Sequence, residues 1–314
     1  MARYVAKRLL WMIPITLGVA VLVFTLMTFC PGDPAEIILG STATEENLES
    51  LRQELGLNQP FFVRLGTFLS DTFLHFDLGN SWATGASVKD AILERLPRTL
   101  ILATTMMAIS FCIGVPLGIM AAIHQNQWQD NLCMTLALIG ISIPNFWLAL
   151  LLVLLFSVKL GWLPAMGIGG LQYYILPALA GCTGGIATSA RQTRSSMLDV
   201  IRSDYITTAR AKGVPEHQVI IKHALKNGMI PVMGTHFGKM LGGTMIIETI
   251  FSIPGMGQLI INAVNGRDYQ VVQVGAVFLA IAFSFCMLAV DLLYAAVDPR
   301  IKAKYSSKGR KKVK

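Results

Sequence analysis

Lys239 and His236 are the two side chains whose positions offer the most chemistry in this sequence. Both lie in the apolar run 229–251, with Lys239 near its middle. From there either membrane surface is roughly 15 Å away at 1.5 Å per residue, too far for comfortable snorkelling. A charge at that depth costs about 3 kcal/mol unless it meets water or a partner. The pair therefore indicates either a translocation path, where Lys239 meets a substrate carboxylate, or an internal ion pair that holds the helices together.

The same run carries a second signal, since Gly234, Gly238 and Gly242 recur every four residues. Two overlapping small-xxx-small repeats favour close packing of this helix against another one. Glu248 is about 180° around the helix from Lys239, so it is a poor direct partner for the lysine. We expect it to line the pathway or to serve packing.

Motifs for enzymatic chemistry are missing. The sequence contains no G-x-x-x-x-G-K-[ST] phosphate loop, no H-E-x-x-H and no nucleophile elbow. His217 and His223 are six residues apart, which does not suit one metal ion on one helix face. We therefore expect no catalytic residue, no metal site and no cofactor bound by this chain.

The five cysteines lie far apart, each within or at the edge of an apolar segment. Their spacing fits neither a disulfide framework nor a metal site. We expect them to be small buried hydrophobic residues. They are Cys30, Cys112, Cys133, Cys182 and Cys286.

Composition indicates a membrane protein. The 314 residues are 54% hydrophobic and 14% charged, whereas soluble domains are about 25% charged. The net charge of +8 raises the alternative of nucleic-acid binding. That alternative is disfavoured because the positive residues flank apolar runs and form no single stripe.

Six apolar segments predict an all-α protein with six transmembrane helices. The first has about 22 residues, too many for a signal-peptide core of 7–15, so we expect it to remain as a span. Prolines within or near the segments (Pro14, Pro116, Pro144 and Pro177) predict kinks. The predicted spans are 9–30, 99–123, 132–158, 173–190, 229–251 and 271–297.

Orientation follows from Lys and Arg. Eighteen lie in the segments 1–8, 124–131, 191–228 and 298–314, against seven in the alternate segments, and Lys239 falls inside a span. This predicts a cytoplasmic N-terminus (1–8) and a basic cytoplasmic tail (298–314).

The outer loop 31–98 is acidic, with ten Asp and Glu against five Lys and Arg. Thr44 is placed to cap a helix over 45–55 that ends at Gly56, and a second amphipathic stretch follows over 60–69. We expect a structured extracytoplasmic loop with amphipathic helices, which is compatible with docking of a substrate-delivery protein.

The basic segment, residues 191–228, holds seven Lys and Arg. Good helix formers fill 207–212, Gly213 ends them, and Pro215 starts a second helix. Two short helices bent about a glycine at a membrane surface are typical of a docking element for another protein.

These last residues resemble the EAA loop of the permease subunits of ABC importers, more narrowly the dipeptide, oligopeptide and nickel branch. The resemblance rests first on Asp204-Tyr-Ile-Thr-Thr-Ala-Arg-Ala-Lys-Gly213 and His223-Ala-Leu-Lys-Asn227. Further matching stretches are Pro31-Gly-Asp-Pro-Ala35, Asp77-Leu-Gly79, Glu248-Thr-Ile-Phe-Ser-Ile-Pro-Gly-Met-Gly257, Arg267-Asp-Tyr269 and Asp291-Leu-Leu-Tyr-Ala-Ala-Val-Asp-Pro-Arg300.

The resemblance implies a type I importer permease fold, with an ABC transmembrane type-1 core over 99–297, in a bacterial cytoplasmic membrane. It implies a second homologous permease subunit, two cytoplasmic ATPase subunits that bind ATP and Mg, and an extracytoplasmic substrate-binding protein. The family's Glu-Ala-Ala is Thr-Thr-Ala here, so an ion pair from that position is lost. The implied ATPase-coupling residues are Asp204, Tyr205, Thr207, Thr208, Ala209, Arg210, Gly213, His223, Asn227 and Pro231.

The cargo stays open between short peptides and nickel or a nickel chelate. Lys239 favours peptides, because a bare cation would be repelled there. A secondary transporter or channel that works alone is a further alternative, but neither an internal repeat nor a run of buried carboxylates supports it.

Overall fold

The structure is a computed structural model that describes residues 2–40, 43–225, 227–228 and 243–297. The described part is built of helices, in two compact units. Of the described residues, one unit comprises 2–98 with 254–285, and the other comprises 99–253 with 286–297. The helices α5 (Val88–Ile123) and α13 (Tyr269–Val297) contribute residues to both.

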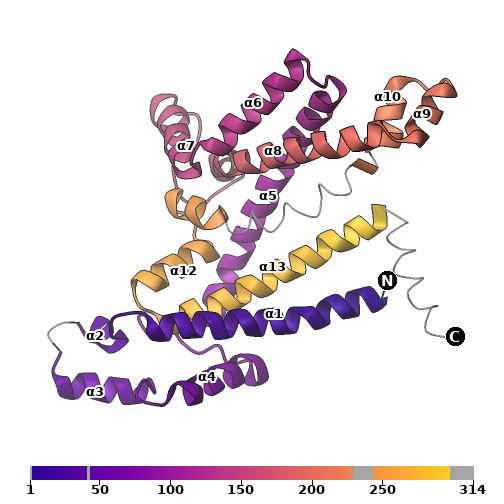
Figure 1. The fold of residues 1–314 in the computed structure, drawn as a ribbon. Helices are drawn as coiled ribbons and strands as arrows, with labels where there is room; N and C mark the ends of the chain where they lie inside the picture. Colours follow the sequence, from indigo (N-terminus) through magenta and orange to yellow (C-terminus); the bar gives the residue numbers. More distant parts are fainter. Residues whose placement is uncertain (1, 41–42, 226, 229–242, 298–314) are drawn as a thin grey trace, which may run out of the picture. The chain divides into compact units, whose positions relative to one another are not determined.

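The first unit begins with α1 (Ala2–Phe29), which continues through Pro14. The cap, residues 31–98, follows with α2 (Pro34–Leu39), α3 (Glu45–Glu54), α4 (Phe61–Ser70) and the π-helical turn η1 (Asp71–His75). Helix α12 (Met256–Asn265) and the first part of α13 complete the unit. Figure 1 shows α1 and α13 running side by side with α4 next to α1, and one apolar core joins residues of all three.

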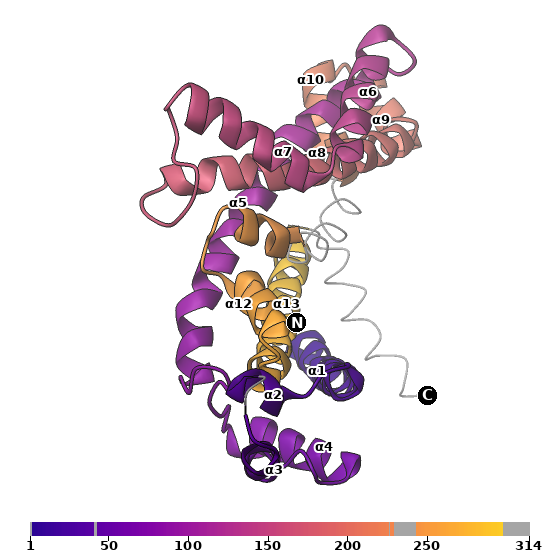
Figure 2. The same cartoon turned by 90° about the vertical axis from the view of Figure 1, so that its left-hand side faces the viewer.

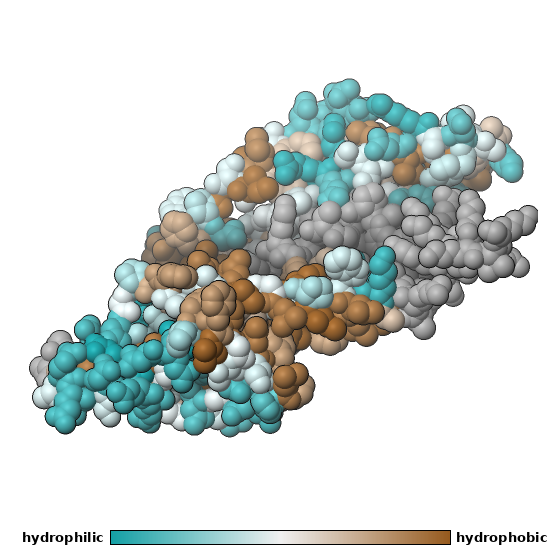
Figure 3. Space-filling model, turned by 60° about the horizontal axis from the view of Figure 1, so that its bottom comes forward, coloured by the Kyte–Doolittle hydropathy of each residue, from teal (hydrophilic) through white to brown (hydrophobic). Residues whose placement is uncertain are grey.

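The helix predicted after Thr44 is confirmed. The Thr44 hydroxyl accepts a hydrogen bond from the Asn47 amide at 3.4 Å, as an N-cap does, and Gly56 follows the helix end at φ +66°. The second amphipathic stretch is α4. Figure 3 shows hydrophilic residues gathered over the cap helices and hydrophobic ones along α1, where Leu10, Trp11 and Leu26 are exposed. Such a helix suits contact with lipid.

The second unit packs α6 (Trp128–Ser142) and α7 (Asn145–Leu152) against α8 (Gln172–Ile201), as Figure 2 shows. The π-helical turn η2 (Val153–Lys159) extends α7. Helices α9 (Asp204–Ala211) and α10 (Glu216–Gln218), the π-helical turn η3 (Val219–Leu225) and the helical residues 243–250 follow. Helix α8 runs past the predicted fourth span, because 191–201 contains no glycine or proline to stop it.

The predicted third span is not one straight helix. One half is α6 and the other half is α7 continued by η2, and the two halves meet at 94°. The cause is Pro144, which lacks an amide hydrogen and pushes Ile143 into an extended conformation at ψ 121°. A kink was predicted here, but its size was not.

Among the described residues, three helices are long and apolar enough to cross a membrane. They are Val5–Phe29, Val88–Ile123 and Tyr269–Ala289, and the bent pair is a candidate fourth. Helix α8 is not among them, and most of the predicted fifth span lies outside the described residues. The count of six spans therefore stays a prediction.

The prediction that the cysteines are buried is correct for Cys133 and Cys182 and wrong for Cys112, which is exposed on α5. Cys30 and Cys286 are half-buried. The prediction overlooked that a membrane helix also turns an apolar face outward, where cysteine is equally acceptable.

Candidate functional site

The predicted ATPase-coupling residues that the structure describes gather in one helical bend, residues 204–228. Helix α9 ends before Gly213, whose φ of +76° reverses the chain, and Pro215 precedes α10. A Cβ at Gly213 would meet nothing within 4 Å. Glycine is required there by backbone conformation and not by lack of space.

Apolar side chains anchor the bend. Ile206 of α9, and Val219 and Ala224 of η3, are fully buried. They pack with Met197 of α8 and Ala122 of α5 in one cluster. The amphipathic pattern of α9 thus directs one face to the body of the second unit and leaves the other face open.

The open face carries most of the predicted coupling side chains. Ala209 is half-buried against the apolar cluster, and Asn227 is half-buried as well. The predicted residues on the exposed surface are Asp204, Tyr205, Thr207, Thr208, Arg210, Gly213 and His223.

Polar contacts stabilise the bend from within. Arg210 donates two hydrogen bonds to Glu216, at 3.0 Å from Nε and 2.6 Å from Nη2, and so joins α9 to α10. This contact lowers the pKa of the Glu216 carboxyl. The Asn227 amide donates to the Tyr205 hydroxyl at 2.8 Å and to the His223 carbonyl at 3.2 Å. The structure thus brings Tyr205 of α9 next to Asn227, which lies 22 residues later in the sequence.

Several predicted residues lie outside the described part of the chain, so their roles stay predictions. They are Pro231, Gly234, His236, Gly238, Lys239 and Gly242. Glu248 is described and fully buried, and its Oε1 accepts a hydrogen bond from the Thr99 hydroxyl at 2.7 Å. Its role, in the pathway or in packing, stays a prediction.

A family model described as "Binding-protein-dependent transport system inner membrane component" matches residues 114–303. A second model, of the N-terminal part of the same kind of membrane component, matches residues 1–103. The chain belongs to this family of binding-protein-dependent transport components.

Relatives in this family match along nearly the whole chain. The glutathione transport system permease protein GsiC of Escherichia coli (strain K12) is 44% identical over 307 residues, which cover 97% of this chain and 100% of that protein. A putative peptide transport system permease protein of Brucella abortus (strain 2308) is 44% identical over 313 residues, which cover 96% of this chain and 99% of that protein.

A solved structure shares the fold. One chain of the MetNI methionine ABC transporter in an inward-facing conformation matches with a TM-score of 0.57 and 19% identity. The match covers 66% of this chain and 96% of that one. The chain therefore has the all-α fold of a type I ABC importer permease. Its family membership makes it a membrane-spanning transport component and not a catalytic subunit.

Two contacts that join α8 to its neighbouring helices were not predicted from the sequence. Arg194 of α8 makes a two-pronged ion pair with Asp130 of α6, with both N···O distances 2.6 Å and Asp130 only 2% exposed. Asp130 is the one acid in the predicted inner segment 124–131, which has no Lys or Arg. A lone acid opposite a basic segment was the available signal.

The second missed contact is between α5 and α8. A Cβ at Gly114 would lie 2.6 Å from the Ser189 Cβ, and one at Gly118 would lie 2.5 Å from the Ala190 carbonyl oxygen. The two helices therefore touch backbone to backbone at a Gly-x-x-x-Gly repeat. The spacing rule applied to 234–242 would have found this repeat as well.

Proposed function

We propose that the chain is the permease subunit of an ATP-driven ABC importer that moves short peptides from a substrate-binding protein into the cytoplasm. The observation that carries the proposal is the 44% identity, over nearly the full length, to permeases named for glutathione and for peptide transport. Identity at that level and coverage supports shared cargo chemistry more strongly than a shared fold does.

The exposed face of the helical bend is the proposed contact with the ATPase subunits. An amphipathic helix anchored on one face fits a groove with the other. Because Thr207 stands where the family has an acid, the contact relies on shape and on the Gly213 reversal, with no ion pair from that position.

ATP-driven closure of the ATPase subunits would pull the bend, and α8 would transmit the pull. The Arg194–Asp130 ion pair joins α6 to α8. The close packing of α8 against Gly114 and Gly118 joins α5 to α8. Interior packing at such contacts resists gradual deformation, so the helices would move as one nearly rigid body. The transport pathway would then alternate between its two sides.

The proposal places both termini and the bend in the cytoplasm and the cap on the outer side of a bacterial inner membrane. It includes a second homologous permease, two ATPase subunits that hold ATP and Mg, and a binding protein that docks on the outer side. This chain would bind no cofactor itself.

Reconstitution tests the proposal. The copurified complex in liposomes, with ATP inside and its binding protein outside, should accumulate labelled glutathione or alanylalanine. Uptake by this chain without ATPase subunits would establish a stand-alone transporter instead. Accumulation of ⁶³Ni or a nickel chelate without peptide uptake would replace the peptide with nickel as cargo.

A further inference from the structure

A cavity of about 290 Å³ lies inside the unit that contains the cap. Its walls come from α1, the end of α3 with the turn that follows it, α4, η1, the loop at Trp82 and the first turns of α13. The volume lies at the lower limit of ordinary small-ligand pockets. It is separate from the helical bend, and the function proposed above does not use it.

Arg64 is the one cation that lines this cavity. Its guanidinium lies 5.8 Å from the centroid of the Phe24 ring and is half-buried, and burial lowers its pKa. Within the part of the chain that the structure describes, no carboxylate lies within salt-bridge distance of it. A guanidinium held against an aromatic ring without an acid is suited to pair with an anion from outside.

Thr72 gives an independent indication of a ligand. The residue is 4% exposed and lines the cavity, and its hydroxyl oxygen has no hydrogen-bond partner among the described residues. Buried polar groups without a partner are uncommon, and each calls for a reason. A ligand in the cavity would supply the missing hydrogen bond.

Besides apolar and aromatic residues such as Leu55, Phe68 and Trp82, the rest of the lining includes acidic and amide-bearing side chains. Glu54 and Asp71 contribute carboxylates, and Asp71 also lies 3.5 Å from the His75 ring. Neutral amide groups come from Gln59, Gln270 and the buried Gln273. One cation and two acids around a small space match a molecule with charges of both signs.

We propose that this cavity binds a small zwitterion, a short peptide or an amino acid, with its carboxylate at Arg64 and its ammonium group on the side of Glu54 and Asp71. The inference rests on the proposed function for the choice of peptides as the ligand class. The unit that contains the cap then holds a cargo-binding site of its own, apart from the pathway through the membrane.

Equilibrium binding to the assembled complex in lipid nanodiscs, without binding protein or nucleotide, tests this site. Labelled glutathione and alanylalanine serve as probes. Arg64→Gln should weaken binding about tenfold or more, the scale of a lost charged hydrogen bond. Thr72→Val should weaken it several-fold while leaving thermal stability unchanged or higher, because it removes an unpaired hydroxyl.

Lys89→Gln is the matched control, since it removes one exposed cation from the cap away from the cavity, and it should leave binding within twofold. N-acetylated, C-amidated dialanine should compete at least tenfold more weakly than alanylalanine. No saturable binding of either probe, equal effects of Arg64→Gln and Lys89→Gln, or equal competition by the capped peptide would overturn the site. Normal ATP-driven uptake beside any of these results would leave the proposed function intact.

Discussion

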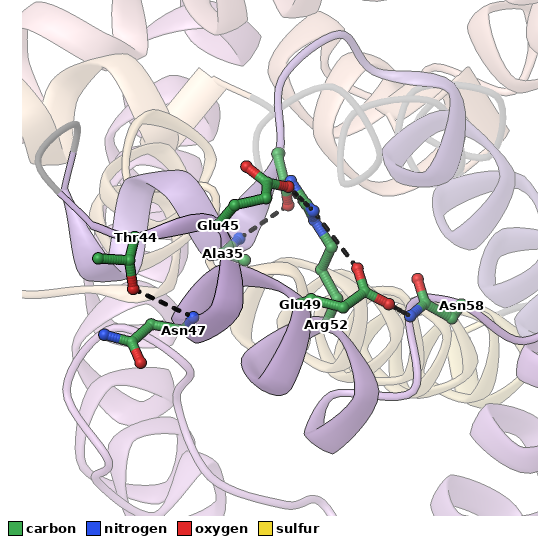
Figure 4. Close-up of polar contacts among 8 residues, drawn as sticks. Ala35, Thr44, Glu45, Asn47, Glu49, Arg52 and Asn58 are labelled. Carbon is green, nitrogen blue, oxygen red and sulfur yellow. Dashed lines mark hydrogen bonds and ion pairs between the residues drawn. The ribbon is translucent and has the colours of Figure 1, made fainter.

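In the cap, charged side chains connect separate helices through hydrogen bonds, whereas the helical bend is anchored by three buried aliphatic side chains. Arg52 donates to Asp33 at 2.7 Å and to Glu45 at 2.8 Å, and Figure 4 shows this network between α2 and α3. Hydrogen bonds to Glu45 and Asp33 raise the pKa of Arg52. The polar side-chain contacts described for 204–228 all stay within that segment.

A second polar connection joins the loop before α5 to the start of α13. The buried Asp268 carboxylate accepts hydrogen bonds from the Ser81 hydroxyl, the Trp82 amide at 3.1 Å and the Val271 amide at 3.3 Å. Hydrogen bonds are directional and apolar contacts are not. The cap is therefore fixed in one geometry. The bend is anchored by apolar contacts, and its polar face stays exposed for contact with another protein.

The largest expected effect is at Gly213. Gly213→Pro cannot adopt φ +76°, because the proline ring holds φ near −65°. We expect transport and substrate-stimulated ATPase activity to be lost while membrane insertion persists, as measured in liposomes. In Gly213→Ala the added Cβ contacts no atom within 4 Å, so the only cost is about 1 kcal/mol for the left-handed backbone conformation. This variant should retain part of the activity.

Gly161→Pro is the matched control for this change, since Gly161 also has a positive φ, +64°, in open space but lies in another loop. It should keep ATPase stimulation. Normal stimulation in Gly213→Pro would remove the bend from the coupling mechanism.

Asp268→Ala should destabilise the cap by about 3 kcal/mol, because it leaves buried donors without their acceptor. Faster proteolysis of residues 31–98 in the assembled complex would show this. Asp77→Ala is the control: Asp77 is exposed and accepts one bond, from the Gly79 amide at 2.9 Å, so the expected loss is at most about 1 kcal/mol. Equal proteolysis in both variants would show that the buried contacts of Asp268 do not fix the cap.

Tyr205→Phe should have a smaller effect, since it removes only the hydroxyl that accepts from Asn227. The expected loss of about 0.5–1 kcal/mol would accelerate hydrogen exchange across 219–228 about two- to fivefold. Tyr173→Phe in α8 should leave that exchange unchanged. An effect above 2 kcal/mol would mean that polar bonds, and not the aliphatic anchors, hold the bend.

The smallest effect is expected for the Arg210–Glu216 pair, which is largely exposed. Glu216→Gln should cost at most about 0.5 kcal/mol, and less at high salt. The pKa of Glu216 is lower in the folded state. The pair's contribution to the stability of the bend is therefore fully present above the ordinary pKa of 4.5 and is lost as pH falls through the lower folded value. Hydrogen exchange of α9 between pH 3 and 7 measures this contribution. A wild-type pH profile identical to that of Glu216→Gln would contradict the prediction.

Local signals in the sequence were sufficient where neighbouring residues determine the structure. Thr44 and Gly56 delimit α3, Gly213 reverses the chain, and Pro144 breaks a helix, because capping, left-handed φ and the missing amide hydrogen act within a few residues. Family resemblance then supplied the fold and the bend's proposed role.

Contacts between distant segments were not predictable in the same way. Arg194 and Asp130 are 64 residues apart, and Ser81 and Asp268 are 187 apart. Either acid had several cations or donors as equally plausible partners until the helices were packed. The outward face of Cys112 was missed for the same reason, because hydropathy alone does not tell the lipid side of a helix from its packed side.

Helix α8 continues unbroken for 30 residues, through Pro177, from the apolar core of its unit to the turn before the bend. At 1.5 Å per residue it is about 45 Å long. A tilt of about 10° at one end of such a rod displaces the other end by about 8 Å, which is more than one helical turn. The helix thus acts as a lever: a displacement of several ångströms at the bend becomes a rotation of a few degrees at the core.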